Sequence, residues 1–315
     1  MAHEDQCCLS IIIPTYNRSR LLKKVLHSLE NQDMDTQDMA RAFEVLVVDD
    51  GSNDDTASMV ERFLETSTLS VRYYFQENKK QGAARNLAVG NSDARFLLFI
   101  GDDIVPDRGF IKSHLDFHAR LDNPEKSCVI GYTTWPGDIP VTPFMEYVGE
   151  FGHQFGYSLI DGNGPLPFNF YYTSNLLVPR SALNLLESWF DEDFDVYGWE
   201  DIELGFRLEK EGVKLYYNPD ALARHYHAMD VLSFCSRQMN VGRASSIFMK
   251  KHPELKWFLG DEHQLIENAG PYLKACIQKY FVHFMDKWLR LPLSHGRYRF
   301  ILDTHYARAA LDHKT

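Results

Sequence analysis

Two adjacent carboxylates interrupt an apolar run in the stretch LLFIGDDIVP, residues 97–106. Asp102 and Asp103 stand where a strand buried on both faces would end, and an isolated buried carboxylate costs several kcal/mol or more. Neighbouring like charges raise each other's pKa unless a cation stabilises both, and hard divalent ions prefer carboxylate oxygens. The pair therefore predicts a metal site, although aspartates also begin ordinary turns.

A second acidic pair ends another apolar run, in VVDDGSNDDT at residues 47–56. Asp54 and Asp55 are explained by the first turn of a helix, where acids complement the helix dipole. That explanation does not cover Asp49 and Asp50 at the strand tip. Their carboxylates can accept hydrogen bonds from a base N–H or a ribose hydroxyl.

Acids also open the segment GWEDIELGFRL, residues 198–208. Apolar residues lie on nearly every side of the helix that this segment predicts, which indicates a buried helix. Glu200 and Asp201 fall at its N-terminal end. There they either complement the helix dipole, an effect of about 0.3 to 1 kcal/mol, or take part in chemistry.

Two histidines stand two residues apart in ARHYH, residues 223–227. In an extended segment this spacing places His225 and His227 on the same side. Either could be a further metal ligand, and either could be a structural histidine.

Short apolar runs alternate with amphipathic stretches from Cys8 to Trp135, the pattern of β-α-β units in a mostly parallel sheet. Four strands are predicted, in LSIIIPTYN, FEVLVVDDGS, VRYYFQ and RFLLFI, with a short small-residue helix, QGAARNLAVG, before the last. Because parallel strands end at one edge of a sheet, where such sheets bind ligands, the polar strand tips should share one rim.

The composition changes after residue 135. Residues 136–167 are rich in Gly, Pro and aromatic residues, which predicts a long irregular segment. A strand (NFYYTSNLLVPR), a helix (SALNLLESWF) and an extended run (VKLYYNPDALARHYH) are expected beyond it, and the chain from Val231 onward is predicted to be helical. The aromatic residues of FGHQFGYS and FNFYYTSN could stack on sugar rings or pack in the core. We expect a domain at residues 1–230 and a helical extension at 231–315.

Composition excludes several classes of protein. The 315 residues include 44% hydrophobic and 24% charged residues, as in an ordinary folded protein. A net charge of −11 argues against binding nucleic acid through a basic surface. The five cysteines are scattered and lack metal-site spacing, which favours reduced thiols in a cytoplasmic protein. We expect no signal peptide, transit sequence or membrane span.

Five motifs in order carry a resemblance: SIIIPTYNR, VVDDGSNDDT, GAARNLAVG, LLFIGDDIVP and GWEDIELGFRL. Together they resemble a family 2 glycosyltransferase of the GT-A fold, over about Leu9 to His227. The resemblance implies an α/β fold with a Rossmann-like, mostly parallel central sheet and flanking helices. It also implies that a nucleotide sugar binds at residues Pro14, Thr15, Tyr16, Asp49 and Asp50, which hold base and ribose, and at Arg85, which approaches the nucleotide or its diphosphate.

The resemblance further assigns the metal motif. It implies Asp103 as the direct ligand, Asp102 nearer the ribose, and His225 slightly ahead of His227 as another ligand. Gly101 stands where many members carry a first Asp, which leaves the number of protein ligands open. The implied cofactor is Mn²⁺ or Mg²⁺.

The resemblance implies that Asp201 is the general base that takes a proton from an acceptor hydroxyl, with Glu200 as the alternative. A positioned base accelerates such a step by about 100-fold to 10,000-fold. A divalent ion bridging the diphosphate would stabilise the charge of the leaving group. The expected enzyme is an inverting hexosyltransferase of polysaccharide biosynthesis that uses a nucleoside diphosphate sugar, with uridine as the expected base.

Other interpretations stay open. The expected acceptor is a saccharide or a lipid-linked molecule, and the helical tail could contact the inner face of a membrane or form a homodimer, with internal packing or a dimer favoured. The main alternative is a catalytically silent nucleotide-sugar binding module. A sugar nucleotidyltransferase and a Rossmann dehydrogenase are disfavoured, because PTYNR replaces the glycine-rich phosphate loop that they need.

Overall fold

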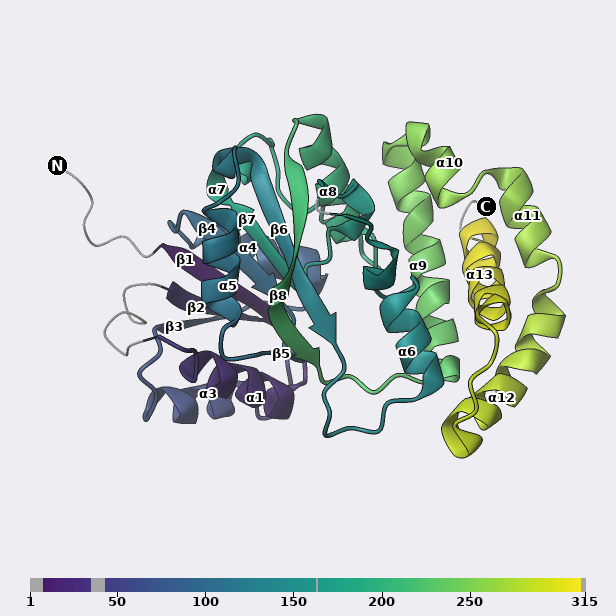
Figure 1. The fold of residues 1–315 in the computed structure, drawn as a ribbon, viewed down its shortest axis with the longest axis horizontal. Coiled ribbons are helices and arrows are strands. Elements are labelled where there is room, and N and C mark those ends of the chain that lie inside the picture. Colours follow the sequence, from purple (N-terminus) through teal and green to yellow (C-terminus); the bar gives the residue numbers. More distant parts are fainter. Residues whose placement is uncertain (1–7, 35–42, 163, 313–315) are drawn as a thin grey trace. The chain divides into compact units, whose positions relative to one another are not determined.

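The computed structural model describes residues 8–34, 43–162 and 164–312. The described chain divides into two compact units (Figure 1). The first unit comprises the described residues of Met1–Pro136, Gly162–Glu192 and Asp201–Tyr226. The second unit comprises those of Gly137–Asp161, Asp193–Glu200 and His227–Thr315. Neither unit is a single continuous stretch of chain. The predicted domains at 1–230 and 231–315 are continuous, and they stay a prediction.

The first unit is built on an eight-stranded sheet with the order β3-β2-β1-β4-β7-β6-β8-β5. Its strands are β1 (Leu9–Thr15), β2 (Phe43–Asp49), β3 (Val71–Phe75), β4 (Phe96–Ile100), β5 (Ile104–Pro106), β6 (Ser127–Thr134), β7 (Asn175–Pro179) and β8 (Lys214–His225). The four strands from β3 to β4 run parallel, and among the described strands only β7 and β5 run against the rest. This mostly parallel α/β sheet confirms the predicted fold class.

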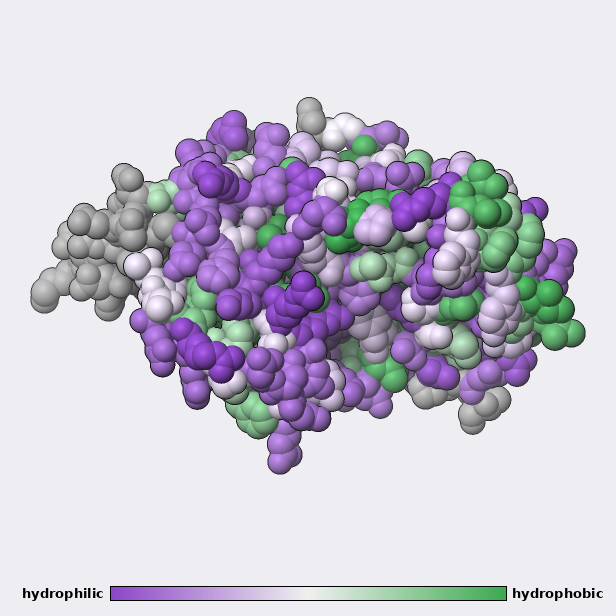
Figure 2. Space-filling view, turned by 90° about the horizontal axis from the view of Figure 1, so that it is seen from below, coloured by the Kyte–Doolittle hydropathy of each residue, from purple (hydrophilic) through white to green (hydrophobic). Residues whose placement is uncertain are grey.

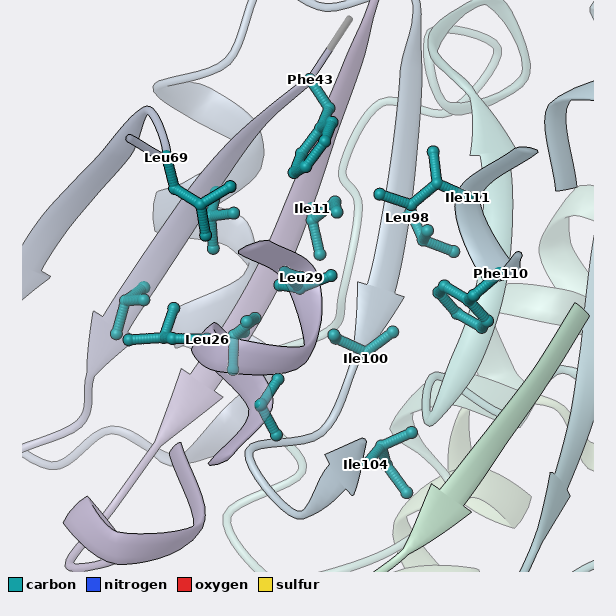
Figure 3. Close-up of a cluster of buried hydrophobic side chains, with 14 of the residues drawn as sticks. Ile11, Leu26, Leu29, Phe43, Leu69, Leu98, Ile100, Ile104, Phe110 and Ile111 are labelled. Atoms are coloured by element: carbon teal, nitrogen blue, oxygen red, sulfur yellow. The ribbon is translucent and has the colours of Figure 1, made fainter. Parts of the chain in front are cut away.

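Helices cover both faces of the sheet. They are α1 (Ser19–Glu30), α3 (Thr56–Leu64), α4 (Lys80–Gly90), α5 (Phe110–His118), α7 (Arg180–Leu183) and α8 (Glu200–Lys210). The buried stripe of α1, which includes Leu26 and Leu29, packs with α3 and α5 on the side of the sheet that carries Ile11 and Leu98 (Figure 3). The alternate residues, such as Phe99, face the opposite side, where Phe99 meets Phe190. Strands covered on both faces are apolar throughout, which explains the uninterrupted hydrophobic runs.

The chain order explains the shared rim. From β1 the chain runs outward to β2 and β3 and then returns to β4 on the other side of β1. Thr15 is the register partner of Asp49, and its hydroxyl donates a hydrogen bond of 2.8 Å to Asp102 Oδ2 beyond β4. The polar ends of the first, second and fourth strands therefore lie together, as predicted.

The sheet is also strongly curled. β4 occupies the fourth place in the order and β5 the eighth, yet only residues 101–103 separate Ile100 from Ile104. Four strand spacings in a flat sheet are about 19 Å. Four steps of extended chain reach about 14 Å. The far edge of the sheet must therefore roll back toward the end of β4.

The second unit is helical. Its helices are α6 (Pro143–Glu150), α9 (Val231–Lys251), α10 (Lys256–Leu259), α11 (Glu262–Ala269), α12 (Tyr272–Leu289) and α13 (His295–Asp312). Gly242 of α9 lies against α13 so closely that an added Cβ would be 2.3 Å from the Tyr306 carbonyl oxygen. The prediction of a helical chain after Val231 is confirmed.

Two local predictions differ from the structure, and one helix was not predicted. The expected irregular segment contains α6, which begins with a proline after Thr142, whose hydroxyl accepts a hydrogen bond from Met145 N. The helix expected in SALNLLESWF is only the four-residue α7. Helix α5 was not expected, although its buried side chains pack in the core.

Candidate active site

The acidic pair follows β4 in a tight turn closed by a hydrogen bond of 3.2 Å from Ile104 N to Gly101 O. Both carboxylates are buried. Burial, and then the charge of Asp103, raise the pKa of Asp102 to about 6, against the opposing effect of Arg18. Two buried acids side by side thus disfavour full ionisation, as expected where a cation is to be held.

Arg18 lies across both carboxylates. Its Nη1 donates to Asp103 Oδ2 at 2.5 Å and to Asp102 Oδ1 at 3.1 Å. Burial lowers the pKa of Arg18, but the two carboxylates outweigh this effect and raise the pKa above its ordinary value. The single positive charge of the guanidinium therefore offsets part of the negative charge of the pair.

Gly101 has a steric role beside the acids. A Cβ at this position would lie 2.9 Å from Asp103 Oδ1 and 3.2 Å from Ile104 Cγ1. A side chain here would press on the carboxylate of Asp103. The departure from an acidic residue at position 101 thus leaves space for Asp103 in its present orientation.

The pairing of β5 with β8 brings a histidine to the acids. Ile104 is the register partner of His225, so the residue before β5 meets the end of β8. His225 Nε2 lies 3.5 Å from Asp103 Oδ2, and the imidazole stacks on Trp135 with ring centroids 5.3 Å apart. His227 continues the same segment two residues on. One ligand atom from each of Asp103, His225 and His227 lies within 4.8 Å of the others, a donor set that fits a divalent cation.

Internal hydrogen bonds engage the acids after β2. Asp49 accepts from Ser52 N at 2.7 Å and from the Tyr73 hydroxyl at 2.6 Å. Asp50 accepts from Gln76 Nε2 and from Lys79 N, both at 2.7 Å, and from Lys80 N. Both acids are buried, and in this structure they shape the turns beside the rim.

The remaining nucleotide-site candidates flank this rim. Thr15 is buried, Pro14 is partly buried, and the Tyr16 ring is exposed at the end of β1. Arg85 lies in α4, buried, with its guanidinium 5.2 Å from the ring centroid of Phe190.

Helix α8 carries the two candidate bases. Asp201 is partly buried, and its Oδ2 accepts from Thr173 N at 3.3 Å and from Thr173 Oγ1 at 3.4 Å. Burial, and then the charge of Asp201, raise the pKa of the Tyr172 hydroxyl. Glu200 is more deeply buried than Asp201. Phe206 and Leu208 are buried on different sides of α8, in line with the prediction of a buried helix.

Several parts of this arrangement were not predicted. Neither Arg18, in the PTYNR motif, nor Trp135 is among the residues that the sequence predicts for the site. A cation directly after a polar strand tip was the available signal for Arg18. The aromatic clusters of residues 151–158 and 168–175 contain buried side chains at Phe155, Tyr157, Phe168, Phe170 and Tyr171, which supports their packing in the core.

Comparison with known proteins identifies the family of the chain. The model of the family described as glycosyl transferase family 2 matches residues 10–184. Validoxylamine A glucosyltransferase of Streptomyces hygroscopicus subsp. jinggangensis is 29% identical over 278 residues, covering 78% of this chain and 61% of that protein. The chain thus spans about three fifths of this relative. A second relative, from Methanococcus voltae, is 26% identical over 255 residues, which cover 77% of this chain and 74% of that protein. It is named dolichyl N-acetyl-alpha-D-glucosaminyl phosphate 3-beta-D-2,3-diacetamido-2,3-dideoxy-beta-D-glucuronosyltransferase.

Solved structures share the fold. The mannosyltransferase PcManGT from Pyrobaculum calidifontis, in complex with GDP-Man and Mn²⁺, has a TM-score of 0.61 at 19% identity, covering 98% of this chain and 86% of that chain. S. aureus TarS in complex with UDP-GlcNAc has a TM-score of 0.51 at 18% identity, and the match covers 98% of this chain and 91% of that chain.

Proposed function

Because the chain belongs to glycosyl transferase family 2, we propose that it transfers a sugar from a nucleoside diphosphate sugar to a hydroxyl acceptor, with inversion at the anomeric carbon. The observation that carries the proposal is the convergence of Asp103, His225 and His227 beyond the end of β4. Asp103 lies more than 100 residues before the two histidines in the chain, yet the ligand atoms of all three lie within 4.8 Å of one another.

The donor side of the proposal concerns a divalent cation. Asp103, His225 and His227 would hold it, with Asp102 beside them toward the ribose. One carboxylate with two imidazoles suits Mn²⁺ better than Mg²⁺, which prefers oxygen ligands. When bound, the ion would stabilise the negative charge of the departing diphosphate. PcManGT, a structural relative, was solved with Mn²⁺.

The nucleoside is proposed to lie along the rim formed by β1 and β2. The exposed Tyr16 ring offers a stacking surface for a base, with Pro14 and Thr15 beside it. Asp49 and Asp50 each retain acceptor capacity for ribose or base donors, because a carboxylate has about four lone-pair sites. Arg85 would approach the diphosphate. Uridine is the proposed base, in keeping with the UDP-GlcNAc complex of TarS.

Asp201 is proposed as the general base. Thr173 fixes one carboxylate oxygen through two donors, at 3.3 and 3.4 Å, which orients the side chain. Asp201 would take the proton of the acceptor hydroxyl as that oxygen bonds to the anomeric carbon. The bond from the anomeric carbon to the diphosphate oxygen breaks on the opposite side, and the electron pair leaves with the diphosphate. Glu200 is less suitable, because it is the more buried of the two acids.

The proposed acceptor is a saccharide, either free or attached to a lipid. The Methanococcus voltae relative bears a name that specifies a dolichyl phosphate sugar. Neither form is needed for the first test of the chemistry, because hydrolysis of the donor by water reports on the same donor site.

The test compares Asp201→Asn with the wild-type protein. Nucleotide sugars would be screened with Mn²⁺ for donor hydrolysis and for transfer to a panel of hydroxyl acceptors, and UDP binding would be measured by calorimetry. We expect Asp201→Asn to bind UDP normally and to lose at least about 100-fold in transfer rate. Glu211→Gln, at an exposed acid just beyond the same helix, is the matched control.

Two results would overturn the proposal. Transfer by Asp201→Asn at the wild-type rate would remove the assigned base. A wild-type protein that binds UDP tightly but turns over none of the donors would favour the silent binding module.

A further inference from the structure

Helix α12 presents a continuous apolar face to solvent. Six of its side chains are between 51 and 76% exposed: Leu273, Ile277, Tyr280, Phe281, Phe284 and Trp288. Figure 2 shows hydrophobic side chains gathered over the C-terminal helices on the right. We call these six residues the α12 face. An exposed apolar patch of this kind marks an interaction surface.

The α12 face is a coherent stripe. At 3.6 residues per turn, the six side chains fall within an arc of about 100°. The buried residues Ala275, Val282 and Asp286 point in the opposite direction, about 170° away on the same wheel. The helix is therefore anchored by one side to the rest of the second unit and exposes an apolar stripe, about 24 Å long at 1.5 Å per residue, on the other.

The segment that carries the stripe is rich in basic residues. Residues 272–299 contain six lysines and arginines, namely Lys274, Lys279, Lys287, Arg290, Arg297 and Arg299. Their one acid, Asp286, is buried and accepts a hydrogen bond of 2.7 Å from Phe144 N. Lys274 and Lys287 are exposed and flank the stripe on its two sides. This local excess of positive charge contrasts with the net charge of −11 of the whole chain.

We propose that the α12 face binds in the plane of a bilayer that contains anionic lipid. Apolar side chains would enter the boundary between headgroups and acyl chains, while Lys274 and Lys287 extend toward the phosphates. Trp288 and Tyr280 suit that boundary, because their rings combine an apolar body with a polar group. A helix with one apolar exposed side and one side packed on the protein can lie on a membrane surface. No helix in the described part of the chain is long and apolar enough to cross one.

A second copy of this chain is a less suitable occupant. Pairing two α12 faces would bring the basic residues of each copy against those of the other, and like charges at an interface are unfavourable. An anionic lipid surface instead complements those charges. The inference does not depend on the proposed donor, acceptor or catalytic residues.

The test is sedimentation of the full chain with vesicles. We expect binding to vesicles of phosphatidylcholine with phosphatidylglycerol, weaker binding to phosphatidylcholine alone, and loss of the difference at high salt. Ile277→Glu combined with Phe284→Glu should reduce vesicle binding at least tenfold. Lys274→Gln should weaken binding to the anionic vesicles about fivefold, since each basic residue near such a surface contributes about 1 kcal/mol.

The control is Leu64→Glu, which makes one substitution of the same kind at an exposed apolar position of α3. It should bind vesicles like the wild type. UDP binding should be unchanged in all of these variants, so a failure of membrane binding is separate from a failure of the proposed transfer.

Two results would overturn the inference. Either the wild type does not sediment with anionic vesicles, or the double variant sediments as well as the wild type does. A wild-type dimer in light scattering that the double variant converts to a monomer would assign the α12 face to a second copy instead.

Discussion

One carboxylate oxygen of Asp103 lies close to both a guanidinium and an imidazole. Arg18 Nη1 is 2.5 Å and His225 Nε2 is 3.5 Å from the same carboxylate oxygen. Any cation that binds this oxygen must compete with Arg18. The metal affinity of the site therefore depends on how easily the Arg18 side chain moves.

This geometry leads to a prediction for metal binding. Asp103→Asn and His225→Ala should each weaken Mn²⁺ binding in the presence of UDP at least tenfold, because each removes a donor from the cluster that fits the ion. Calorimetric titration with MnCl₂ measures the change. His263→Ala, at an exposed histidine of α11, serves as control. Unchanged affinity in Asp103→Asn would contradict the proposed ligand set.

His114 gives a second prediction, on pH. Burial lowers the pKa of His114 to about 4 from 6.5, and its Nε2 pairs with Asn175 Oδ1 at 2.7 Å. Between these values the unfolded chain binds a proton that the folded chain does not, so the free energy of unfolding falls as the pH falls from 6.5 toward 4.

Unfolding in urea at pH 6.5 and pH 5 tests the role of His114. The wild type should lose about 1.6 kcal/mol more than His114→Gln over this interval, because the unfolded histidine is half protonated at pH 6.5 and almost fully protonated at pH 5. His263→Gln should behave like the wild type. Equal losses in the wild type and His114→Gln would show that the imidazole does not titrate in this range.

The sequence predicted the positions of some site residues and missed those of others. Asp102, Asp103 and Thr15 stand at strand ends, and local pattern alone placed them on one rim. The meeting of His225 with Asp103 depends on the pairing of β5 with β8, more than 100 residues apart. Local pattern holds no information on such pairing. The positions of Arg18 and Trp135 in the cluster were missed because they depend on tertiary packing of the same kind.

At the scale of elements, β6 and β8 pair through a register shift between Gly131 and Tyr132. A Cβ at Gly131 would lie 2.4 Å from both the Ala221 carbonyl oxygen and Asn175 Nδ2. The close approach lets Asn175 donate to the Ala221 carbonyl at 2.9 Å. Gly131 thus allows three strands to meet tightly.

Gly131→Ala should therefore destabilise the fold by about 3 kcal/mol, because a backbone oxygen cannot move aside as a flexible side chain can. Chemical unfolding measures the loss. Gly137→Ala, where nothing lies within 4 Å of the added carbon, should change the stability little. Equal free energies of unfolding for Gly131→Ala and Gly137→Ala would contradict this prediction, because they would mean that the strands can move apart without a loss of stability.

The elements were predicted best where their periodicity was strong. The four N-terminal strands were expected close to their observed bounds, and the chain after Val231 was expected to be helical, without bounds for its separate helices. Helix α6 was missed because glycine, proline and aromatic residues surround its eight residues and hide its periodicity. Helix α7 is shorter than expected, since residues 184–192 do not continue it.

At the scale of the whole molecule, two segments from the middle of the chain join the C-terminal helices in the second unit. The composition changes at residue 136 and resembles a loop, so sequence pattern could not assign those segments to a distant partner. The candidate residues from β1, β2, α4 and β4 all belong to the first unit.

Ligand binding should stabilise the whole chain against heat. UDP with Mn²⁺ at 100 times its dissociation constant should add about 2.7 kcal/mol of stability, which corresponds to a rise in Tm of several degrees. Differential scanning fluorimetry measures the shift. EDTA and Asp103→Asn should each remove the manganese-dependent part. An equal shift with and without the metal would count against a shared site.

The short connection between β4 and β5 keeps the sheet curled, because it holds the edge strand close to the end of β4. Residues 101–103 span the distance from a central strand to an edge strand and also carry both acids. An inserted residue would lengthen this connection and at the same time turn Asp103 away from His225. The length of this connection thus fixes both the curl of the sheet and the position of the proposed metal ligand. Natural variants of this chain should therefore tolerate substitutions in the connection more readily than any change in its length.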